Sequence, residues 1–302
     1  MNKKMIGRLL GQLIALETVC LVPALGISLG FGEWNAAAAT AVSMGIMLAV
    51  SGILWLLCRR TGKHFGATEG MVCVSLGWIL LSLLGALPFY LSREIPRYLD
   101  ALFEIVSGFT TTGASVLSDV ESLPKGILYW RSFSHWLGGM GVLVFLLAVA
   151  PAEGGDKGFT MHLMRAESPG PDVGKLVPRM KQTAMILYVI YVVLTIINAI
   201  FLLCGGMDLL EAVCTALGTA GTGGFGVRND SMASYSPYIQ NVTTVFMLLF
   251  GVNFSCYYLL LLRQFRGVIR DEELRLYILL FVGATVAIFV NLWVKLEPVY
   301  GS

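Results

Sequence analysis

Seven long apolar blocks constrain this 302-residue chain more than any other feature. They lie near residues 9–31, 35–58, 70–91, 126–150, 182–204, 237–262 and 274–296. A transmembrane helix needs about 20 mostly apolar residues to cross a hydrocarbon core about 30 Å thick. Only 13% of the residues are charged, whereas a soluble domain carries about 25%. The sequence therefore predicts an all-α polytopic membrane protein that lies in a lipid bilayer.

Lysine and arginine are concentrated in alternate connections between these blocks. With the amino terminus inside, 15 of them fall on the inner side and 6 on the outer side. The inner ones come from residues 1–8, 59–69, 151–181 and 263–275. Because inner loops of membrane proteins carry the excess of basic residues, we expect a cytoplasmic amino terminus. The first block is too long for a typical signal peptide and no small-residue cleavage site follows it, so we expect an anchor helix.

Two apolar runs between the blocks are too short to span. Asp100 to Phe109 and Asp208 to Leu217 each hold about ten residues, and each leads into a tract of threonine and glycine before the chain becomes polar. A half-length helix followed by irregular backbone is typical of a re-entrant loop, which is tolerated only inside protein or along a watery cavity. The alternative is an amphipathic loop on the membrane surface, but a Thr/Gly tract supplies neither an apolar face nor basic anchors.

The same unit, a span followed by a half-helix, a Thr/Gly loop and a second span, occurs twice in one direction. We expect an N-terminal two-helix segment at 1–69 and a first pore repeat at 70–150. A cytoplasmic link at 151–181, a second pore repeat at 182–262 and the start of a third repeat at 263–302 follow. Because one repeat cannot bury its inner face without neighbours, we expect the sequence to stop short of the full array.

The Thr/Gly tracts offer uncharged oxygens suited to a dehydrated cation. Consecutive carbonyls can replace a hydration shell, glycine permits the positive φ that such a strand needs, and the half-helix carboxyl end directs partial negative charge toward the ion. The candidate ligands of a transported potassium ion are Thr110, Thr111, Thr112, Gly113, Thr219, Ala220, Gly221, Thr222 and Gly223.

The second tract also fits the dinucleotide-binding pattern G-x-G-x-x-G at Gly221, Gly223 and Gly226. That fingerprint needs a strand before its first glycine and a helix opening at its last. Here a helical run precedes the glycines and the polar stretch VRNDSMASYSP follows them. The chain also lacks a Ser/His/Asp set, clustered metal ligands and a phosphate-binding lysine, so the sequence predicts no enzyme and no bound cofactor.

Three segments resemble a known family. The stretch FEIVSGFTTTGASVLSDVESLPKGILYWRSFSHWLGGMGVLVFLLAVAP at 103–151 resembles the first pore repeat of the TrkH/TrkG/KtrB family of bacterial potassium transporters, and 165–184 and 218–255 resemble its link and second loop. The resemblance implies potassium-selective uptake across the inner membrane through four repeats around one pore. It also implies homodimers, a cytoplasmic TrkA-like nucleotide-binding partner and no nucleic acid. Thr111, Thr112 and Gly113 would be filter residues.

The second filter strand can be aligned in two ways. Glu104 lies 9 residues before Gly113, whereas Glu211 lies 10 before Gly221 and 12 before Gly223. We favour Gly223 as the counterpart of Gly113, because the family shows Gly-Gly-Phe at this point. Since two of the family's four loops are missing, the alternative to a pore-forming subunit is a non-conducting half-subunit or scaffold.

Several charged residues have competing interpretations. For Glu17, inside the first span, we favour pairing with a neighbouring Ser, Thr or backbone group over an ion-path role. We expect Arg131 to pair with a pore-loop acid and brace the loop. The outer acids could concentrate cations or form an ordinary solvated rim; they are Asp100, Glu104, Asp119, Glu121, Asp208, Glu211 and Asp230.

Overall fold

A computed structural model describes residues 2–59, 67–141 and 180–300, and every regular element in these ranges is helical. The helices are α1 (Lys3–Cys20), α2 (Val22–Gly30), α3 (Trp34–Leu57), α4 (Ala67–Gly85), α5 (Leu87–Leu91), α6 (Tyr98–Phe109), α7 (Lys125–Met140), α10 (Met180–Cys204), α11 (Leu209–Ala220), α12 (Pro237–Gly251), α13 (Phe254–Leu261), α14 (Phe265–Arg270) and α15 (Glu272–Tyr300). Residues 142–179 lie outside the described residues, and with them most of the expected link 151–181 and the end of the block 126–150.

Among the described residues, five helical stretches are long and apolar enough to cross a membrane. They are Lys3–Gly30, Trp34–Leu57, Thr68–Leu91, Met185–Cys204 and Glu272–Trp293, and α12 with α13 forms a further, broken one bent by 86°. These stretches correspond to six of the seven apolar blocks, and the seventh is α7 in its described part. The predicted all-α polytopic architecture is confirmed.

Proline marks the breaks in two of these spans. A proline occupies the first turn of α2 and of α5, just after the breaks at Leu21 and Ala86. Proline lacks a backbone N–H and clashes with the preceding turn, so it is tolerated at the start of a helix and not in its interior. Each break therefore lies where the sequence permits a new helix to begin.

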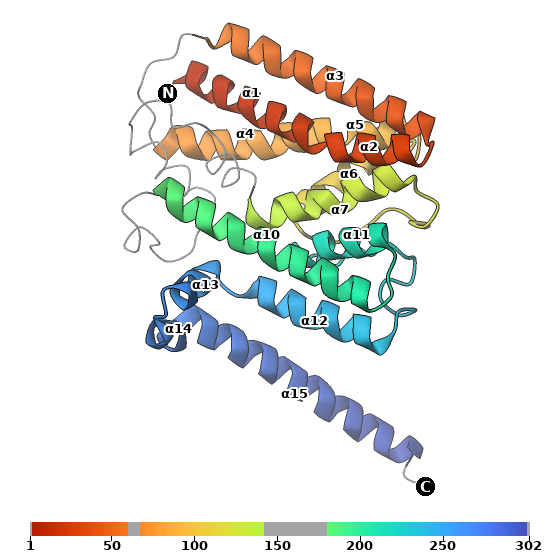
Figure 1. Ribbon diagram of the computed structural model, residues 1–302, viewed down its shortest axis with the longest axis vertical. Helices are drawn as coiled ribbons and strands as arrows, with labels where there is room; N and C mark the ends of the chain where they lie inside the picture. The colour runs from red at the N-terminus through yellow and green to blue at the C-terminus, as the bar shows by residue number, and fades with distance from the viewer. Residues whose placement is uncertain (1, 60–66, 142–179, 301–302) are drawn as a thin grey trace. The chain divides into compact units, whose positions relative to one another are not determined.

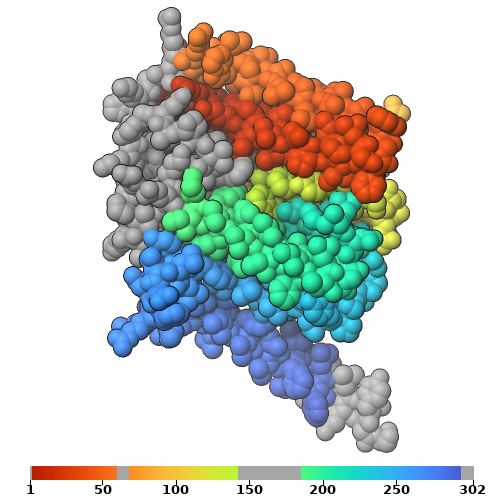
Figure 2. Space-filling view, in the orientation of Figure 1, coloured from red at the N-terminus to blue at the C-terminus, as the bar shows by residue number. Residues whose placement is uncertain are grey.

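The chain divides into two compact units, Met1–Met247 and Leu248–Ser302, which we describe separately. In the first unit, α1 packs on α3 and α4, and α7 contacts α2, α6 and α11 (Figure 1). The atoms of α1 to α3 cover one side of this unit (Figure 2). Helix α7 thus connects the N-terminal helices to both half-helices, and its buried Trp130, Ile127 and Leu137 belong to the core.

The second unit holds the last turn of α12 with α13, α14 and α15. Asn253 caps α13 by accepting a hydrogen bond from Ser255 N at 2.9 Å. The Tyr277 hydroxyl on α15 donates to the Leu248 carbonyl oxygen at 3.1 Å. The apolar side chains of α15 between Leu276 and Trp293 are exposed, as is expected of a helix that contacts lipid or further protein.

The order span, half-helix, loop, helix occurs twice, as α4–α5, α6, α7 and as α10, α11, α12. The start of α7 is held by the N-terminal helices: Glu33 accepts hydrogen bonds from Lys125 N at 2.7 Å and Gly126 N at 3.3 Å. A carboxylate at this end also complements the helix dipole. A Cβ atom added at Gly126 would overlap Ser28 Oγ and lie 2.5 Å from the Ala24 carbonyl oxygen.

We therefore predict that Gly126→Ala lowers the free energy of unfolding by about 1–3 kcal/mol, the usual range for overpacking. The Ala24 carbonyl oxygen belongs to the backbone of α2, which cannot move away from the added Cβ as a flexible side chain could. The matched control is Gly52→Ala in α3, where an added Cβ meets nothing within 4 Å. Denaturant titration of the purified protein in mixed micelles measures both; equal stability of the two variants would contradict the prediction.

Candidate functional site

The two half-helices end in the same way. Both α6 and α11 have 12 residues, and Tyr98 and Leu209, like Phe109 and Ala220, are 111 positions apart. After α6, Thr110 N donates to Val106 O at 2.8 Å and Thr111 N to Gly108 O at 3.0 Å. After α11, Gly221 N donates to Leu217 O at 3.3 Å and Thr222 N to Thr219 O at 2.9 Å. The hydrogen bonds therefore repeat with the same spacing of 111 positions.

The loops that follow also share an alternation of backbone torsions. In the first loop φ is positive at Thr111 (52°) and Gly113 (75°), and in the second at Thr222 (54°) and Gly224 (85°). A β-branched residue with positive φ is an outlier. Such residues cost about 1–3 kcal/mol each, persist only where their surroundings impose them, and cluster at ligand clamps. Both loops hold a threonine in this strained state at the second residue after the half-helix.

The register of the second loop differs from the one expected from sequence. Torsions and hydrogen bonds align Thr110 to Gly113 with Gly221 to Gly224. Gly224 thus corresponds to Gly113, and the favoured Gly223 corresponds to Thr112. No insertion is needed, because the apparent offset came from pairing Glu104 with Glu211. The structural counterpart of Glu104 is Thr215, 111 positions later.

The structure places the nine candidate residues in two settings. Thr219 and Ala220 form the last turn of α11, where the Thr219 hydroxyl donates to Thr215 O at 2.7 Å. The other seven follow the half-helices. In the first loop the hydroxyls of Thr110 and Thr112 lie 2.8 Å apart and are exposed, and Thr112 N donates to Ser107 O at 2.9 Å.

The two loops meet at their glycines. A Cβ atom added at Gly113 would overlap the Gly223 carbonyl oxygen, and one added at Gly223 would lie 2.7 Å from Thr111 O. A Cβ added at Gly221 would lie 2.7 Å from the His135 carbonyl oxygen of α7. Glycine is therefore required at these positions by close packing of the loops on each other and on α7.

A buried ion pair between α6 and α7 contacts both loops. Arg131 Nε on α7 donates to Glu104 Oε1 on α6 at 2.7 Å, and the two side chains are 3% and 0% exposed. Glu104 also accepts from Ser115 Oγ at 2.9 Å and Val116 N at 3.0 Å in the first loop. Arg131 Nη1 donates to Gly226 O of the second loop at 2.9 Å. The expected brace between Arg131 and a pore-loop acid is present and reaches both loops.

Phe225 adds an aromatic contact to this brace. The Arg131 guanidinium carbon lies 3.6 Å from the Phe225 ring centroid. The His135 ring stacks on Phe225 with centroids 3.9 Å apart and planes inclined by 4°. Residues 131 and 135 are one helical turn apart and share a face of α7, so this face holds the second loop through Phe225. Single-sequence reasoning missed His135 and Phe225, because no local pattern signals a contact between segments about 90 positions apart.

Asn229 joins the outer ends of the two loops. Its Oδ1 accepts from Val120 N at 2.7 Å, its backbone N donates to Glu121 Oε1 at 3.0 Å, and its Nδ2 donates to Asp119 Oδ1 at 2.9 Å. The Asn229 hydrogen bond lowers the pKa of Asp119 from its ordinary value, and bonds from Ser122 and from the Glu121 N–H act in the same direction.

The second half-helix has a more exposed ion pair. Arg228 Nη2 lies 3.3 Å from Glu211 Oε2, and Tyr235 Oη donates to the same oxygen at 3.2 Å. The Arg228 guanidinium also lies 4.2 Å from the Tyr235 ring centroid. Desolvation, with the Glu211 charge, raises the pKa of Tyr235 to about 12. Of the acids expected at the outer rim, Glu104, Asp119, Glu121 and Glu211 are thus engaged in fixing the loops.

The dinucleotide interpretation of the glycines does not fit this geometry. Helix α11, not a strand, precedes Gly221, and the chain runs without a helix from Gly221 to Ser236 before α12 begins. The glycine spacing serves contacts with His135 and the first loop instead. Within the described residues there is also no group of three or more His, Cys, Asp or Glu that could hold a metal ion.

The fold and the paired loops define a class: a polytopic helical membrane protein built from repeats of span, half-helix, extended loop and helix. A family model described as "TrkH: Cation transport protein" matches residues 37–297. The chain belongs to the TrkH family, a family of transport proteins and not of enzymes. The family expected from the sequence is confirmed.

Individual relatives support the same family assignment. The chain is 35% identical to the Trk system potassium uptake protein TrkH of Escherichia coli K12 over 308 residues, covering 100% of this chain and 62% of that protein. It is 31% identical to TrkG of the same organism, with 99% and 62% covered. A crystal structure of the potassium transporter TrkH from Vibrio parahaemolyticus superposes with a TM-score of 0.82 at 30% identity, covering 100% of this chain and 61% of that one. The chain thus spans less than two thirds of the length of these relatives.

The brace generates a prediction about stability. Arg131→Met leaves the Glu104 carboxylate buried without its partner, which costs about 3–5 kcal/mol in comparable pairs. Adding Glu104→Leu removes the stranded charge, so the double variant should lose less than the sum of the two single losses. Arg228→Met, at the half-exposed pair with Glu211, should cost only about 0–1 kcal/mol. Unfolding free energies of Arg131→Met, Glu104→Leu, the double variant and Arg228→Met test this. A loss in the double variant equal to the sum of the losses in Arg131→Met and Glu104→Leu would contradict it.

A second prediction concerns Asp119. Its lowered pKa means that the bonds to Asp119 stabilise the fold above the ordinary pKa and are lost as pH falls through the lowered value. Asn229→Ala removes the largest cause, so Asp119 should titrate at higher pH in this variant. Ser234→Ala, which alters a hydroxyl bonded to Asp230, is the control. The carbon-13 shift of the Asp119 carboxyl measures both, and an unchanged titration in Asn229→Ala would refute the assignment.

Proposed function

We propose that this chain forms part of a potassium pore, in which the loops after α6 and α11 provide backbone oxygens to the passing ion. The observation that carries the proposal is the matched alternation of φ in two loops that touch at Gly113 and Gly223. Alternating torsions are compatible with a strand whose carbonyls gather on one side, as the filters of potassium channels use. The transported ion changes binding partners and no covalent bond.

Several features support an ion path at this place. The carboxyl ends of α6 and α11 both lead into the loops, so their partial negative charges favour a cation there. The exposed hydroxyls of Thr110 and Thr112 add neutral oxygens. The buried brace fixes the loop segments that follow the strained threonines, through Ser115, Val116 and Gly226, and a filter needs such support because its oxygens must be in place before the ion arrives.

Potassium is proposed as the ion because the relatives named above are potassium uptake proteins. We further propose that the amino terminus is cytoplasmic, in a bacterial inner membrane, and that the protein works as a homodimer with a cytoplasmic TrkA-like nucleotide-binding subunit. Two loops do not surround an ion. A complete filter would therefore need further loops, from the part of the relatives' length that this chain does not span.

The alternative is a non-conducting half-subunit or scaffold. Expression of the chain and of its uninterrupted downstream reading frame in a bacterium that lacks potassium uptake separates the two. Growth at limiting potassium with the extended frame, and not with residues 1–302 alone, is the expected result. Failure of the extended frame, with protein present in the membrane, would reject the transport proposal. Growth with the short chain would show that it assembles a pore by itself.

Gly113 provides the sharper prediction. Gly113→Ala adds a side chain at positive φ that also overlaps the Gly223 carbonyl oxygen, so potassium uptake should fall about tenfold or more, which corresponds to a barrier on the ion path raised by about 1.4 kcal/mol or more. Gly32→Ala is matched for backbone strain, because Gly32 has φ 72° and an added Cβ there meets nothing within 4 Å. Uptake of rubidium as a potassium tracer measures both. Equal rates in the two variants would remove Gly113 from the path.

A further inference from the structure

Helix α1 holds a carboxyl group that the pore loops do not use. Glu17 is 3% exposed, and neither of its carboxyl oxygens has a hydrogen-bond partner among the described residues. The sequence favoured pairing with a Ser, Thr or backbone group, and the structure shows no such pair. The Thr18 hydroxyl beside it donates to Ile14 O at 2.8 Å.

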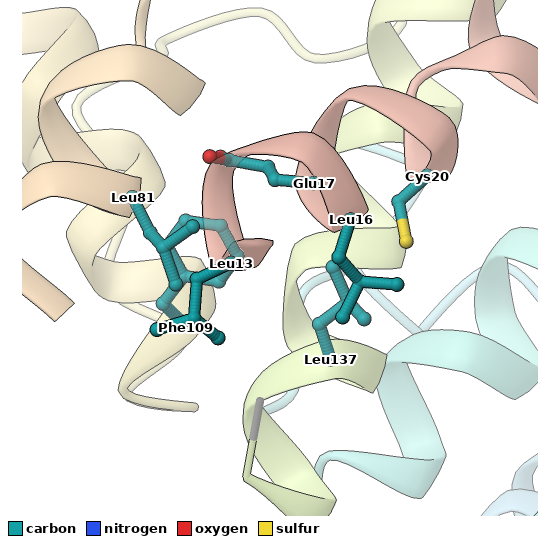
Figure 3. Close-up of a pocket in the computed structure, with 7 residues that line it drawn as sticks. All are labelled: Leu13, Leu16, Glu17, Cys20, Leu81, Phe109 and Leu137. Carbon is teal, nitrogen blue, oxygen red and sulfur yellow. The ribbon is translucent and has the colours of Figure 1, made fainter. Parts of the chain in front are cut away.

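Apolar side chains surround this carboxyl. A cavity of about 10 Å³ is lined by Leu13, Leu16, Glu17, Cys20, Leu81, Phe109 and Leu137 (Figure 3). Gly85 closes another side, since a Cβ added there would lie 2.6 Å from Glu17 Oε1 and 3.2 Å from Ile105. The elements packed around Glu17 are thus α1, α4, α6 and α7. Among these lining residues the Cys20 thiol is the only other titratable group, and none carries a charge.

This environment restricts what Glu17 can bind. An ionised carboxylate without a partner in an apolar site is so costly that the group takes up a proton instead. The cavity is at the lower limit for one water, and a buried water needs two to four polar partners. A metal cation requires several oxygens, whereas this cavity supplies one carboxyl. A proton is the one cation that a lone carboxyl can hold.

We propose that Glu17 is a proton-binding site at the base of the first pore loop, neutral in this structure, whose ionisation disturbs the end of α6. Phe109 lines the cavity and is the last residue of α6, directly before Thr110. Gly85, against the carboxyl, accepts a hydrogen bond from Trp130 Nε1 at 2.9 Å, and the Trp130 and Phe109 rings lie 6.3 Å apart at 85°. Charge on Glu17 requires water to enter between α1, α4 and α6, and this displaces Phe109.

The proton site and its effect are tested separately, because the effect rests on the proposed ion path and the site does not. Infrared spectroscopy of the protein in lipid, with carbon-13-labelled glutamate, detects the C=O stretch of a protonated carboxylic acid. We expect this band at neutral pH in the wild type and in Glu33→Gln, and its loss in Glu17→Gln. Glu33 is the matched control because two backbone N–H groups already satisfy its carboxylate. No band in the wild type, or a band that persists in Glu17→Gln, overturns the site.

Rubidium flux through the full-length protein, recorded against pH, tests the coupling. Flux in the wild type should fall relative to Glu17→Gln as alkaline pH ionises Glu17, with a difference of at least severalfold at the highest pH that leaves both folded. Parallel pH profiles overturn the coupling while leaving the infrared result intact. Absence of flux in every variant at every pH counts against the proposed transport function and, with it, against the coupling.

Discussion

The buried pair of Glu104 and Arg131 is the interaction on which the arrangement of both loops depends. Two charges removed from water are tolerated only when further hydrogen bonds satisfy them. Here those bonds come from Ser115 and Val116 on one side and from Gly226 on the other. The chemistry of the pair therefore requires the backbone of both loops as ligands. The same contacts that satisfy the charges fix the paths of the two loops.

A rigid support is needed because the loops hold strained residues. Thr111 and Thr222 keep positive φ, a state that relaxes unless neighbouring contacts prevent it. The loops touch at Gly113 and Gly223, and Gly221 packs on the α7 backbone. Packing against protein thus explains a glycine spacing that matches a phosphate-binding pattern. Glycine spacing alone does not distinguish close approach of the backbone to a phosphate from close approach to another loop or helix.

The sequence was sufficient for features that depend on composition along one segment. Apolar length predicted the spans, and the loss of that length at Asp100 to Phe109 and Asp208 to Leu217 predicted the half-helices, of which α11 runs on to Ala220. For the second loop the Gly-Gly-Phe resemblance favoured Gly223 as the counterpart of Gly113, whereas the torsions and hydrogen bonds align Gly224, one residue later. The apparent insertion came from comparing Glu104 with Glu211, which do not occupy equivalent positions of the two half-helices. Their surroundings differ: Glu104 pairs within the core and Glu211 with the half-exposed Arg228. Contacts such as His135 with Phe225 arise only when distant segments pack, so one sequence without its fold does not reveal them.

The two repeats therefore have similar backbones, but their loops are held by different contacts. The first loop is held by an acid of its own half-helix, whereas Thr215 occupies the corresponding place in α11. The second loop instead uses Arg131 and His135 of the first repeat, through Gly226 and Phe225. Its own pair, Glu211 with Arg228, is half exposed and so contributes little rigidity. Order in the second loop therefore depends on α7 of the first repeat, and a disturbance at the α6 end, where Phe109 and Glu17 line the same cavity, would reach both loops through this helix.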